Sequence, residues 1–319
     1  MKTAIRILIF LVLAVPPTVL AQSYPNKPIR FIVGYPPGGG NDISARLIAP
    51  KLSEGLGQPV IVENKPGAGT NIAQELVAKA APDGYTILLA PPSVVINKFL
   101  YKKLPFDALR DLTGVSNFAF SPNIMVVNPS VPAKTVKEFA ALARAKPGHY
   151  TFSSSGNGST QHLSGELFNI RAKVKTLHVP YKGTAPSLTA LISGEVDLSY
   201  SNIPATLAHI KSGRLRALAN TGSKRSELMP DLPTVKESGV DMEIVTWFGV
   251  MVPSGTPRAV IDRLAGLLVK IPYTPEMKQR LHDLGAEPIG STPEEFNKQL
   301  HSEEAMWAEV VKVSGAKAD

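Results

Sequence analysis

The segment IRFIVGYPPGGGNDISARLIAPKL, residues 29–52, shows the unit from which the chain is built. Residues 29–35 have the composition of a buried strand, three consecutive glycines follow, and residues 42–52 have the periodicity of a helix. Strand and helix patterns then alternate along much of the chain. Alternation of this kind predicts an α/β fold with parallel sheets.

The expected elements cover most of the sequence. Strands are expected at 29–35, 59–64, 85–90, 123–128, 150–155, 175–181, 195–200 and 214–221. Helices are expected at 42–52, 72–80, 135–145, 159–170, 185–193 and 203–212, and helical patterns at 257–270, 275–285 and 293–315 follow near the end. Thr135 with Glu138 and Thr292 with Glu295 have capping-box spacing, which predicts two helix starts.

Two long strand-like stretches, residues 114–129 and 242–253, interrupt this alternation. We interpret them as crossovers between two α/β lobes. Lobe 1 is then expected at residues 22–124 and 249–319, and lobe 2 at residues 125–248. A protein of this kind binds its ligand in the cleft between the lobes and closes by a hinge.

The first 21 residues predict export. Lys2 and Arg6 precede an apolar stretch at residues 7–15, and Ala21 ends a segment suited to signal peptidase. The apolar stretch is shorter than the roughly 20 residues that a membrane span needs. We therefore expect a signal peptide, residues 1–21, cleaved after Ala21 to release a periplasmic protein.

The composition and motifs of the chain exclude several classes of functional site. The chain has no cysteine, which excludes disulfides and thiolate sites. Its formal charge of +8 comes from scattered charges of both signs, without the aromatic interleaving of a nucleic-acid surface. Its six histidines lack metal-ligand spacing, and no G-x-S-x-G motif is present. We expect no nucleic-acid partner, no metal and no catalytic residue. The rival hypothesis is an exported α/β hydrolase-like enzyme whose Ser, His and acid meet only in space.

Three glycine-rich elements resemble dinucleotide fingerprints but lack the third glycine. GGGNDI, GAGTNI and GNGSTQ have Ile43, Ile72 and Gln161 at that position. A P-loop sequence is absent as well. The sequence therefore predicts no nucleotide cofactor.

Two of these elements predict an anion site. The first loop, residues 35–42, and the second loop, residues 154–160, each follow a strand and precede a helix. Ligands of open parallel sheets lie at such connections, and glycines expose the N–H groups of helix N-termini to anions. We expect the two loops to grip a carboxylate from both sides. The alternative is two ordinary turns, in which Asp42 and Ser159 or Thr160 are N-caps.

Longer motifs point to a family. The stretches YPNKPIRFIVGYPPGGGNDISAR, VIVENKPGAGTNIA, FSSSGNGSTQHLSGELF, HVPYKGTAPSLTALISGEVDL and WFGVMVPSGTP occur in order along the mature chain. The chain thereby resembles the periplasmic solute-binding proteins of tripartite tricarboxylate transporters, the TctC or Bug family. The resemblance implies a two-lobed type II periplasmic-binding-protein fold with two parallel-core sheets, flanking helices and hinge crossovers. It also implies a monomer that binds an organic carboxylate, without a cofactor, for inner-membrane transporter subunits.

The resemblance also implies a set of ligand-binding residues, with Tyr181 and Trp247 at cleft-edge or hinge positions and His162 beside the second loop. Carried over by motif, the set is Tyr35, Pro37, Gly38, Gly39, Gly40, Asn41, Asp42, Pro91, Ser93, Ser154, Ser155, Gly156, Asn157, Gly158, Ser159, Thr160, His162, Tyr181, Ser201, Asn202 and Trp247. A solvated or capping role is the alternative for His162, and core packing is the alternative for the two aromatic residues.

Two departures from the family pattern bear on the ligand. Ser201 and Asn202 stand where many members have an acidic residue and asparagine, which disfavours a ligand with an amino group. PPSVV from Pro91 is stiffer and more apolar than the usual loop, which favours an apolar or aromatic portion on the ligand. Family ligands include di- and tricarboxylates and aromatic acids. The same chemistry would also serve a carboxylate sensor for a signalling kinase.

Overall fold

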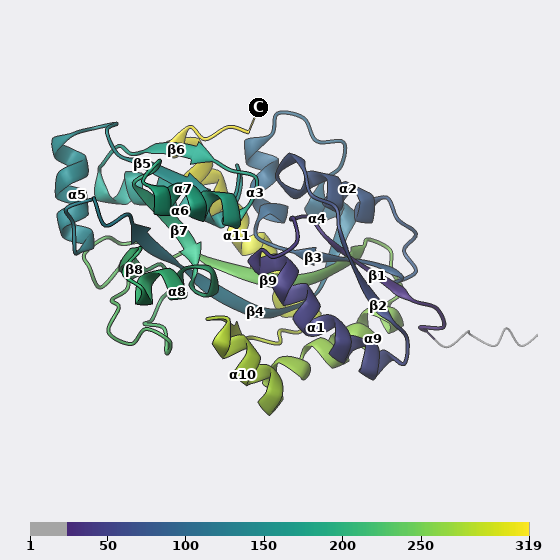
Figure 1. The fold of residues 1–319 in the computed structure, drawn as a ribbon. Helices are drawn as coiled ribbons and strands as arrows, with labels where there is room; N and C mark the ends of the chain where they lie inside the picture. The colour runs from purple at the N-terminus through teal and green to yellow at the C-terminus, as the bar shows by residue number, and fades with distance from the viewer. Residues whose placement is uncertain (1–23, 319) are drawn as a thin grey trace, which may run out of the picture.

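The computed structural model describes residues 24–318, so the expected signal peptide lies outside the described residues. The chain forms an α/β structure whose strands and helices alternate (Figure 1). Its elements are β1 (Ile29–Val33), α1 (Gly40–Leu56), β2 (Val60–Asn64), α2 (Asn71–Ala78), β3 (Thr86–Ala90), α3 (Ser93–Leu100), α4 (Ala108–Asp111), β4 (Leu112–Val127), α5 (Val136–Ala145), β5 (Thr151–Ser154), α6 (Thr160–Ala172), β6 (Leu177–Pro180), α7 (Thr184–Ser193), β7 (Leu198–Asn202), α8 (Ile203–Lys211), β8 (Arg216–Asn220), β9 (Val245–Pro253), α9 (Arg258–Leu268), α10 (Pro275–Asp283), β10 (Glu287–Pro288) and α11 (Pro293–Ser314), with short 3₁₀ helices at Ala68–Thr70 and Ile271–Tyr273.

The strands form a mixed sheet in the order β2-β1-β3-β9-β4-β7-β5-β6, with β8 and β10 also paired to β4. β1 is parallel to β2 and β3, and β5 is parallel to β6 and β7. β4 and β9 run antiparallel to their neighbours. The α/β fold with parallel groups of strands is therefore confirmed, and the two groups are joined by the two antiparallel strands.

β4 connects the two groups of parallel strands. Residues 112–122 of β4 pair with β9, and residues 123–127 pair with β7 and β8. The chain thus passes along one continuous strand from the first half of the sheet (β1, β2, β3, β9) to the second half (β5, β6, β7, β8). It returns to the first half at Val245, where β9 begins.

Two helix starts follow their capping signals. The Thr135 side chain accepts from the Glu138 N–H, and Thr292 with Glu295 forms a full capping box, as expected. α3 was not expected. It begins at Ser93, after two prolines and with a β-branched pair, Val94 and Val95, and this composition hides its helical periodicity.

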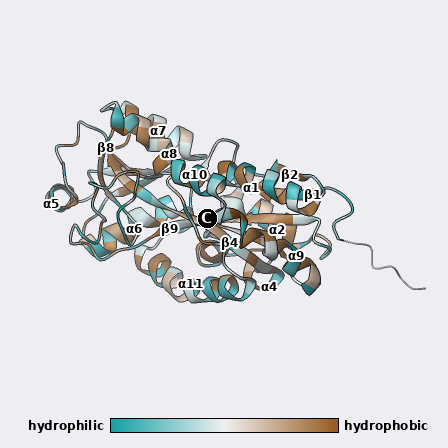
Figure 2. Cartoon of the chain, turned by 90° about the horizontal axis from the view of Figure 1, so that it is seen from below, coloured by the Kyte–Doolittle hydropathy of each residue, from teal (hydrophilic) through white to brown (hydrophobic). Residues whose placement is uncertain are grey.

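The helices after β9 return to the first half of the sheet. Figure 1 shows α9 beside α1, and the Arg263 guanidinium donates to the Gly55 carbonyl there. α11 packs against β4, α3 and α6, so it bridges both halves. In Figure 2, peripheral helices such as α1, α7 and α11 carry both hydrophilic and hydrophobic residues, as helices that cover a sheet must. No helix within residues 24–318 combines the length and apolarity of a membrane span.

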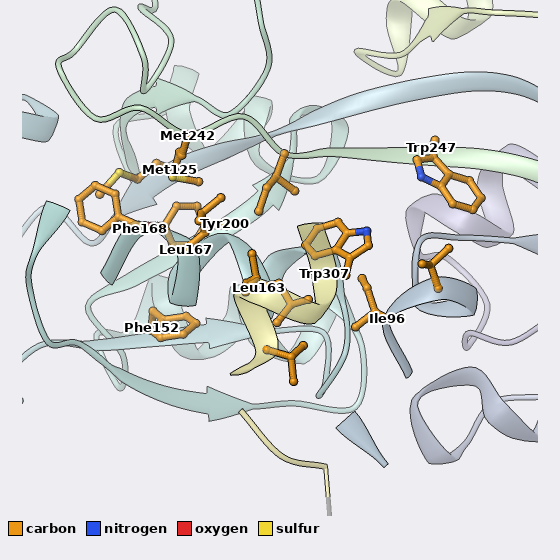
Figure 3. Close-up of a cluster of buried hydrophobic side chains, with 14 of the residues drawn as sticks. Ile96, Met125, Phe152, Leu163, Leu167, Phe168, Tyr200, Met242, Trp247 and Trp307 are labelled. Carbon is orange, nitrogen blue, oxygen red and sulfur yellow. The ribbon is translucent and has the colours of Figure 1, made fainter. Parts of the chain in front are cut away.

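The largest buried cluster extends through both halves of the sheet (Figure 3). Ile96 of α3 and Trp247 of β9 belong to the same cluster as Phe152 of β5 and Tyr200 of β7. Trp307 of α11 lies between them and is buried. The halves therefore share this cluster, and each half also has a smaller buried cluster of its own.

Candidate functional site

A small cavity lies where the parallel strands of both halves end. β1, β3, β5, β6 and β7 all run toward it, and each is followed by a helix: α1, α3, α6, α7 and α8. Its volume is about 120 Å³. We call it the loop cavity, and it is lined by residues 35–41, 91–93, 155, 159–161, 182–186, 202 and 246.

The electrostatics of the loop cavity favour an anion. α1, α7 and α8 begin there at Gly39, Gly183 and Asn202, and none of these N-caps has a side-chain hydrogen bond to the first turn. Unpaired N–H groups at a helix N-terminus carry roughly half a positive charge in sum. Of the described residues that line the cavity, Lys182 alone has a charged side chain.

The Gln161 side chain links three segments that line the loop cavity. Its Oε1 accepts from the Ser155 N–H at 2.8 Å, and its Nε2 donates to Thr184 Oγ1 at 3.2 Å and to Asn202 Oδ1 at 3.4 Å. The first loop approaches this network closely, because a Cβ at Gly40 would lie 3.4 Å from Asn202 Nδ2. The two halves thus meet at the cavity.

The first loop is held by a charged network. The Asp42 carboxylate accepts from the Gly38 N–H at 2.9 Å, from Arg46 Nε at 3.0 Å and from Asn64 Nδ2 at 2.9 Å. Burial acts to raise the pKa of Asp42, but these hydrogen bonds outweigh it and hold the pKa below its usual range. The N-cap of α1 is Gly39, so the expectation that Asp42 is the N-cap is wrong. Asp42 lies three residues further on, and its carboxylate reaches back to the loop.

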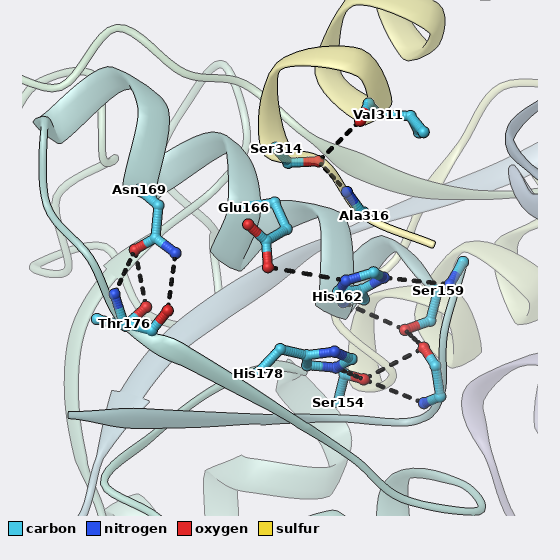
Figure 4. A network of polar contacts seen from close by, with 12 residues as sticks. Ser154, Ser159, His162, Glu166, Asn169, Thr176, His178, Val311, Ser314 and Ala316 are labelled. Carbon is cyan, nitrogen blue, oxygen red and sulfur yellow. Dashed lines mark hydrogen bonds and ion pairs between the residues drawn. The ribbon is translucent and has the colours of Figure 1, made fainter. Parts of the chain in front are cut away.

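The second loop is held by a buried histidine, His162, and a half-buried one, His178 (Figure 4). Ser159 is the N-cap of α6 and accepts from the His162 N–H, which confirms one of the capping alternatives. His162 Nδ1 in turn accepts from the Gly158 N–H at 3.2 Å. The ring of His162 stacks on that of His178, with centroids 3.9 Å apart. His178 Nε2 contacts Ser154 Oγ at 2.6 Å.

The histidine pair is neutral at neutral pH. Burial, together with the neighbouring His178, lowers the pKa of His162 to about 3, and burial lowers the pKa of His178 to about 4. Because His162 Nδ1 accepts a hydrogen bond, its proton lies on Nε2, which is 3.8 Å from Glu166 Oε1. Burial raises the pKa of Glu166 to about 7. Two neutral imidazoles beside a half-protonated carboxyl therefore support the loop.

The structure separates the sequence-predicted residues into two groups. Those that line the loop cavity are Tyr35, Pro37, Gly38, Gly39, Gly40, Asn41, Pro91, Ser93, Ser155, Ser159, Thr160 and Asn202. Those that do not line it are Asp42, Ser154, Gly156, Asn157, Gly158, His162, Tyr181, Ser201 and Trp247.

Several members of the second group have structural partners. Gly158 has φ +78°, and a Cβ there would lie 2.6 Å from Asn97 Oδ1, so this glycine packs against α3. The Tyr181 hydroxyl donates to Glu195, and Trp247 Nε1 donates to Glu303. Ser201 is fully buried in β7.

Nine residues that line the loop cavity are absent from the predicted ligand-binding set, namely Pro36, Pro92, Gln161, Lys182, Gly183, Thr184, Ala185, Pro186 and Thr246. A signal was present for Thr184, because Gly183 and Thr184 follow a strand and open a helix, as the glycines of the first loop do. Thr246 had no signal, since it reaches the cavity from β9 through the pairing of distant strands. Its hydroxyl contacts the Thr160 hydroxyl at 2.5 Å.

Comparison with known proteins adds independent findings. The model of the tripartite tricarboxylate transporter family receptor matches residues 44–316. R. palustris Rpa4515, solved with adipate, is 35% identical, with a TM-score of 0.87 over 92% of this chain and 99% of that one. The periplasmic binding protein BugD is 33% identical, with a TM-score of 0.84 over 92% and 99%. MatC from Rhodopseudomonas palustris, solved with malate, is 30% identical, with a TM-score of 0.82 over 90% and 100%. These similarities confirm the periplasmic-binding-protein fold.

Proposed function

The chain belongs to the tripartite tricarboxylate transporter receptor family, whose solved members include periplasmic binding proteins, and on that premise we propose that it captures an organic carboxylate in the loop cavity and delivers it to a membrane transporter. The observation that carries the proposal is the convergence of helix N-termini from both halves on one cavity. Such N-termini bind carboxylates through backbone N–H groups, without a dedicated arginine.

The ligand would connect the two halves. α1 and α3 belong to the first half, and α6, α7 and α8 belong to the second, so a carboxylate in the loop cavity contacts both. We propose that the halves are lobes, with boundaries at 124/125 and 248/249. Contact with both at once stabilises the closed arrangement relative to the open one, and this differential contact drives closure. The transporter subunits would recognise the closed surface of a periplasmic monomer cleaved after Ala21.

Two lines of reasoning support an organic acid as ligand. Rpa4515 was solved with adipate and MatC with malate, and both ligands are dicarboxylates. The cavity wall also has no acidic side chain among the described residues that line it, so no carboxylate there would compensate the charge of an ammonium group. We therefore propose a carboxylate without an amino group, of the di- or tricarboxylate or aromatic class.

A thermal-shift screen of residues 22–319 tests this proposal. The panel contains adipate, malate, benzoate, inorganic phosphate and ATP. A ligand present at a hundredfold excess over its Kd stabilises the folded state by about 2.7 kcal/mol, which raises Tm by several degrees. At least one carboxylate should give this shift and be recovered chemically unchanged. Turnover of the carboxylate, or shifts with phosphate or ATP alone, would contradict the proposal.

A matched pair of variants locates the site. Gln161→Leu removes the hydrogen bonds to Ser155, Thr184 and Asn202, and it should weaken carboxylate binding about tenfold. Gln279→Leu makes the same change on the exposed side of α10 and should leave affinity unaltered. Equal affinity of the two variants would place the ligand elsewhere.

A further inference from the structure

A second, larger cavity adjoins the loop cavity. Its volume is about 680 Å³, within the range of roughly 300–1,000 Å³ that is usual for small-molecule sites. The two cavities share wall residues from both halves, namely Gly38, Gly39, Gly40, Thr184, Ala185 and Asn202. A molecule held at the first loop can therefore extend directly from one space into the other.

Helix α8 leads from the loop cavity to the far end of the larger one. Its N-cap, Asn202, lines both cavities, and Ala205 and His209 line the larger cavity further along the helix. At 1.5 Å per residue, the distance along α8 from Asn202 to His209 is roughly 10 Å. Arg214 lines the same cavity just beyond the end of α8. The helix therefore separates the glycine loops from a second polar end by the length of a small molecule.

The far end of the larger cavity carries a positive charge. Arg214 is charged, and the other described residues that line this cavity include no Lys, Asp, Glu or second Arg. Its Nε donates to Ser212 Oγ at 3.2 Å, but no described residue accepts from its two terminal nitrogens or pairs a carboxylate with it. The forked N–H groups of a guanidinium match the two oxygens of a carboxylate. The Arg214 side chain is therefore available to bind an anion in the cavity.

His209 adds a second donor at the same end. Burial, together with the nearby Arg214 guanidinium, lowers the pKa of His209 below its ordinary value. The ring is therefore neutral at pH 7 and carries one N–H donor. It forms no hydrogen bond with a described residue, and its Nδ1 is buried. An anion at the far end of the cavity thus has donors from two side chains.

The C-termini of α7 and α8 also lie near this end, and their partial negative charge opposes an anion. Their carbonyl groups are already engaged. The His209 carbonyl accepts from the Ser212 hydroxyl at 3.2 Å on α8. On α7, the Leu191 carbonyl accepts from Asn128 Nδ2 at 2.8 Å. Arg214 instead brings a full positive charge on a side chain that lines the cavity, so its direct contact with a ligand outweighs the bonded carbonyls.

The wall between the two polar ends is apolar. It is formed by Ile43 of α1, Leu188 and Ile192 of α7, Phe248 of β9 and Leu284 after α10. Burial of a hydrocarbon chain against these side chains removes apolar surface from water and is favourable. The wall therefore suits a ligand that is charged at both ends and apolar between them.

We propose that the far end of the larger cavity is a second anion site, in which Arg214 and His209 bind one carboxylate while the glycine loops bind the other. The ligand is then an extended dicarboxylate with an apolar middle and charges roughly 10 Å apart. This inference rests on the proposed function and narrows its ligand class. A four-carbon diacid is too short to reach both ends, because an extended chain advances only about 1.2 Å per bond.

Pairs of diacids and monoacids of equal length test the proposal on the mature chain, with affinities measured by calorimetry. The pairs are butanedioate with butanoate, octanedioate with octanoate, and decanedioate with decanoate. Hydrogen bonds to a charged group should strengthen binding by roughly 10- to 100-fold. At least one of the two longer diacids should show this advantage over its monoacid. Butanedioate should show none over butanoate.

Variants of Arg214 identify the second site. Arg214→Gln removes the guanidinium charge and should reduce the diacid-to-monoacid affinity ratio of the longer pairs to about one. Arg214→Lys keeps the charge without the forked donors and should retain part of the ratio. Arg171→Gln is the control, at an exposed position on α6 that does not line the cavity, and it should retain the full ratio. Because Arg214 is exposed, all three variants should melt close to the wild-type Tm.

The outcomes separate this inference from the function on which it rests. If the longer diacids bind no more tightly than their monoacids, or if Arg214→Gln keeps the full ratio, the second anion site is wrong and the carboxylate receptor stands. If Arg214→Gln weakens monoacids and diacids equally, Arg214 does not bind the second carboxylate and the inference is wrong as well. If none of the carboxylates binds, the proposed function fails together with the inference.

Discussion

The two glycine loops have the same role in the proposed site, but a charged side chain supports the first loop and a neutral one supports the second. Under the first loop, the Asp42 carboxylate accepts from the Gly38 N–H and is paired with the half-exposed Arg46. Under the second loop, the neutral His162 ring accepts from the Gly158 N–H and stacks on His178. In each case a side chain within the first turn of the following helix accepts from a loop N–H.

The surroundings explain the choice of acceptor. The carboxylate of Asp42 lies beside Arg46, which reaches solvent and compensates the buried charge. The imidazole of His162 lies inside the second half among buried side chains, where an unpaired charge would cost several kcal/mol. A neutral acceptor avoids that cost. The comparison shows that the position of the acceptor, rather than its charge, is what the loop requires.

Removal of the buried acceptor should have the largest effect. His162→Phe keeps the ring stack but leaves the buried Gly158 N–H without an acceptor, at a cost of about 2–3 kcal/mol. Tm should fall by roughly 3–5 °C in a calorimetric scan. The control His301→Phe changes an exposed histidine and should move Tm far less. Equal shifts in the two variants would show that His162 does not support the loop.

The pH dependence of stability should sharpen the comparison. In the unfolded chain both histidines are protonated below about pH 6.5. In the folded protein His178 is protonated only below about pH 4 and His162 only below about pH 3. Each histidine therefore lowers the free energy of unfolding as the pH falls below 6.5. Glu166 has its pKa raised to about 7, so it acts in the opposite sense between pH 7 and 4.5. Each group changes the free energy of unfolding by at most about 1.4 kcal/mol per pH unit. Because the two histidines act against the one glutamate, the net loss of stability is about 1.4 kcal/mol for each unit by which the pH falls.

Replacement of Glu166 should therefore steepen the acid side of the stability profile. Glu166→Gln removes the opposing group, and the loss between pH 6 and 5 should approach about 2.8 kcal/mol per unit in urea unfolding. Glu309→Gln, at an exposed position on α11, is the control and should keep the wild-type slope. If the free energy of unfolding of Glu166→Gln changes with pH as steeply as that of the control, Glu166 does not offset the effect of the two histidines.

The charged support of the first loop should give the smallest effect. Asp42→Asn retains an oxygen that can accept from Gly38 but weakens the contact with Arg46, at a cost of about 1 kcal/mol. Because Arg46 is half-exposed, this cost should shrink in roughly 1 M salt, where charges beyond about 3 Å are screened. The destabilisation by His162→Phe should not change with salt. Identical salt responses in chemical denaturation would contradict the contrast between the loops.

Sequence reasoning was most successful where a local pattern determines the structure. Glycines between an apolar run and a helical pattern located both loops, and Ser159 was among the expected caps. It failed where an interaction depends on distant residues. His162 was expected to face the cleft, to be solvated or to act as a cap. Its ring does accept from the Gly158 N–H, but its burial against His178 depends on the pairing of β5 with β6. The composition of residues 91–95 concealed α3, and with it the partner that Gly158 packs against.

The continuous cluster around Trp307 has a consequence for the cooperativity of unfolding. Because Ile96 of the first half and Phe152 of the second half belong to one buried cluster, neither half can lose its packing without exposing apolar surface of the other. The free energies of the two halves are therefore coupled through α11. The described chain should behave in a melting experiment as a single cooperative unit, in which calorimetric and van't Hoff enthalpies agree. A ligand bound at the loops should then raise the free energy of global unfolding for both halves.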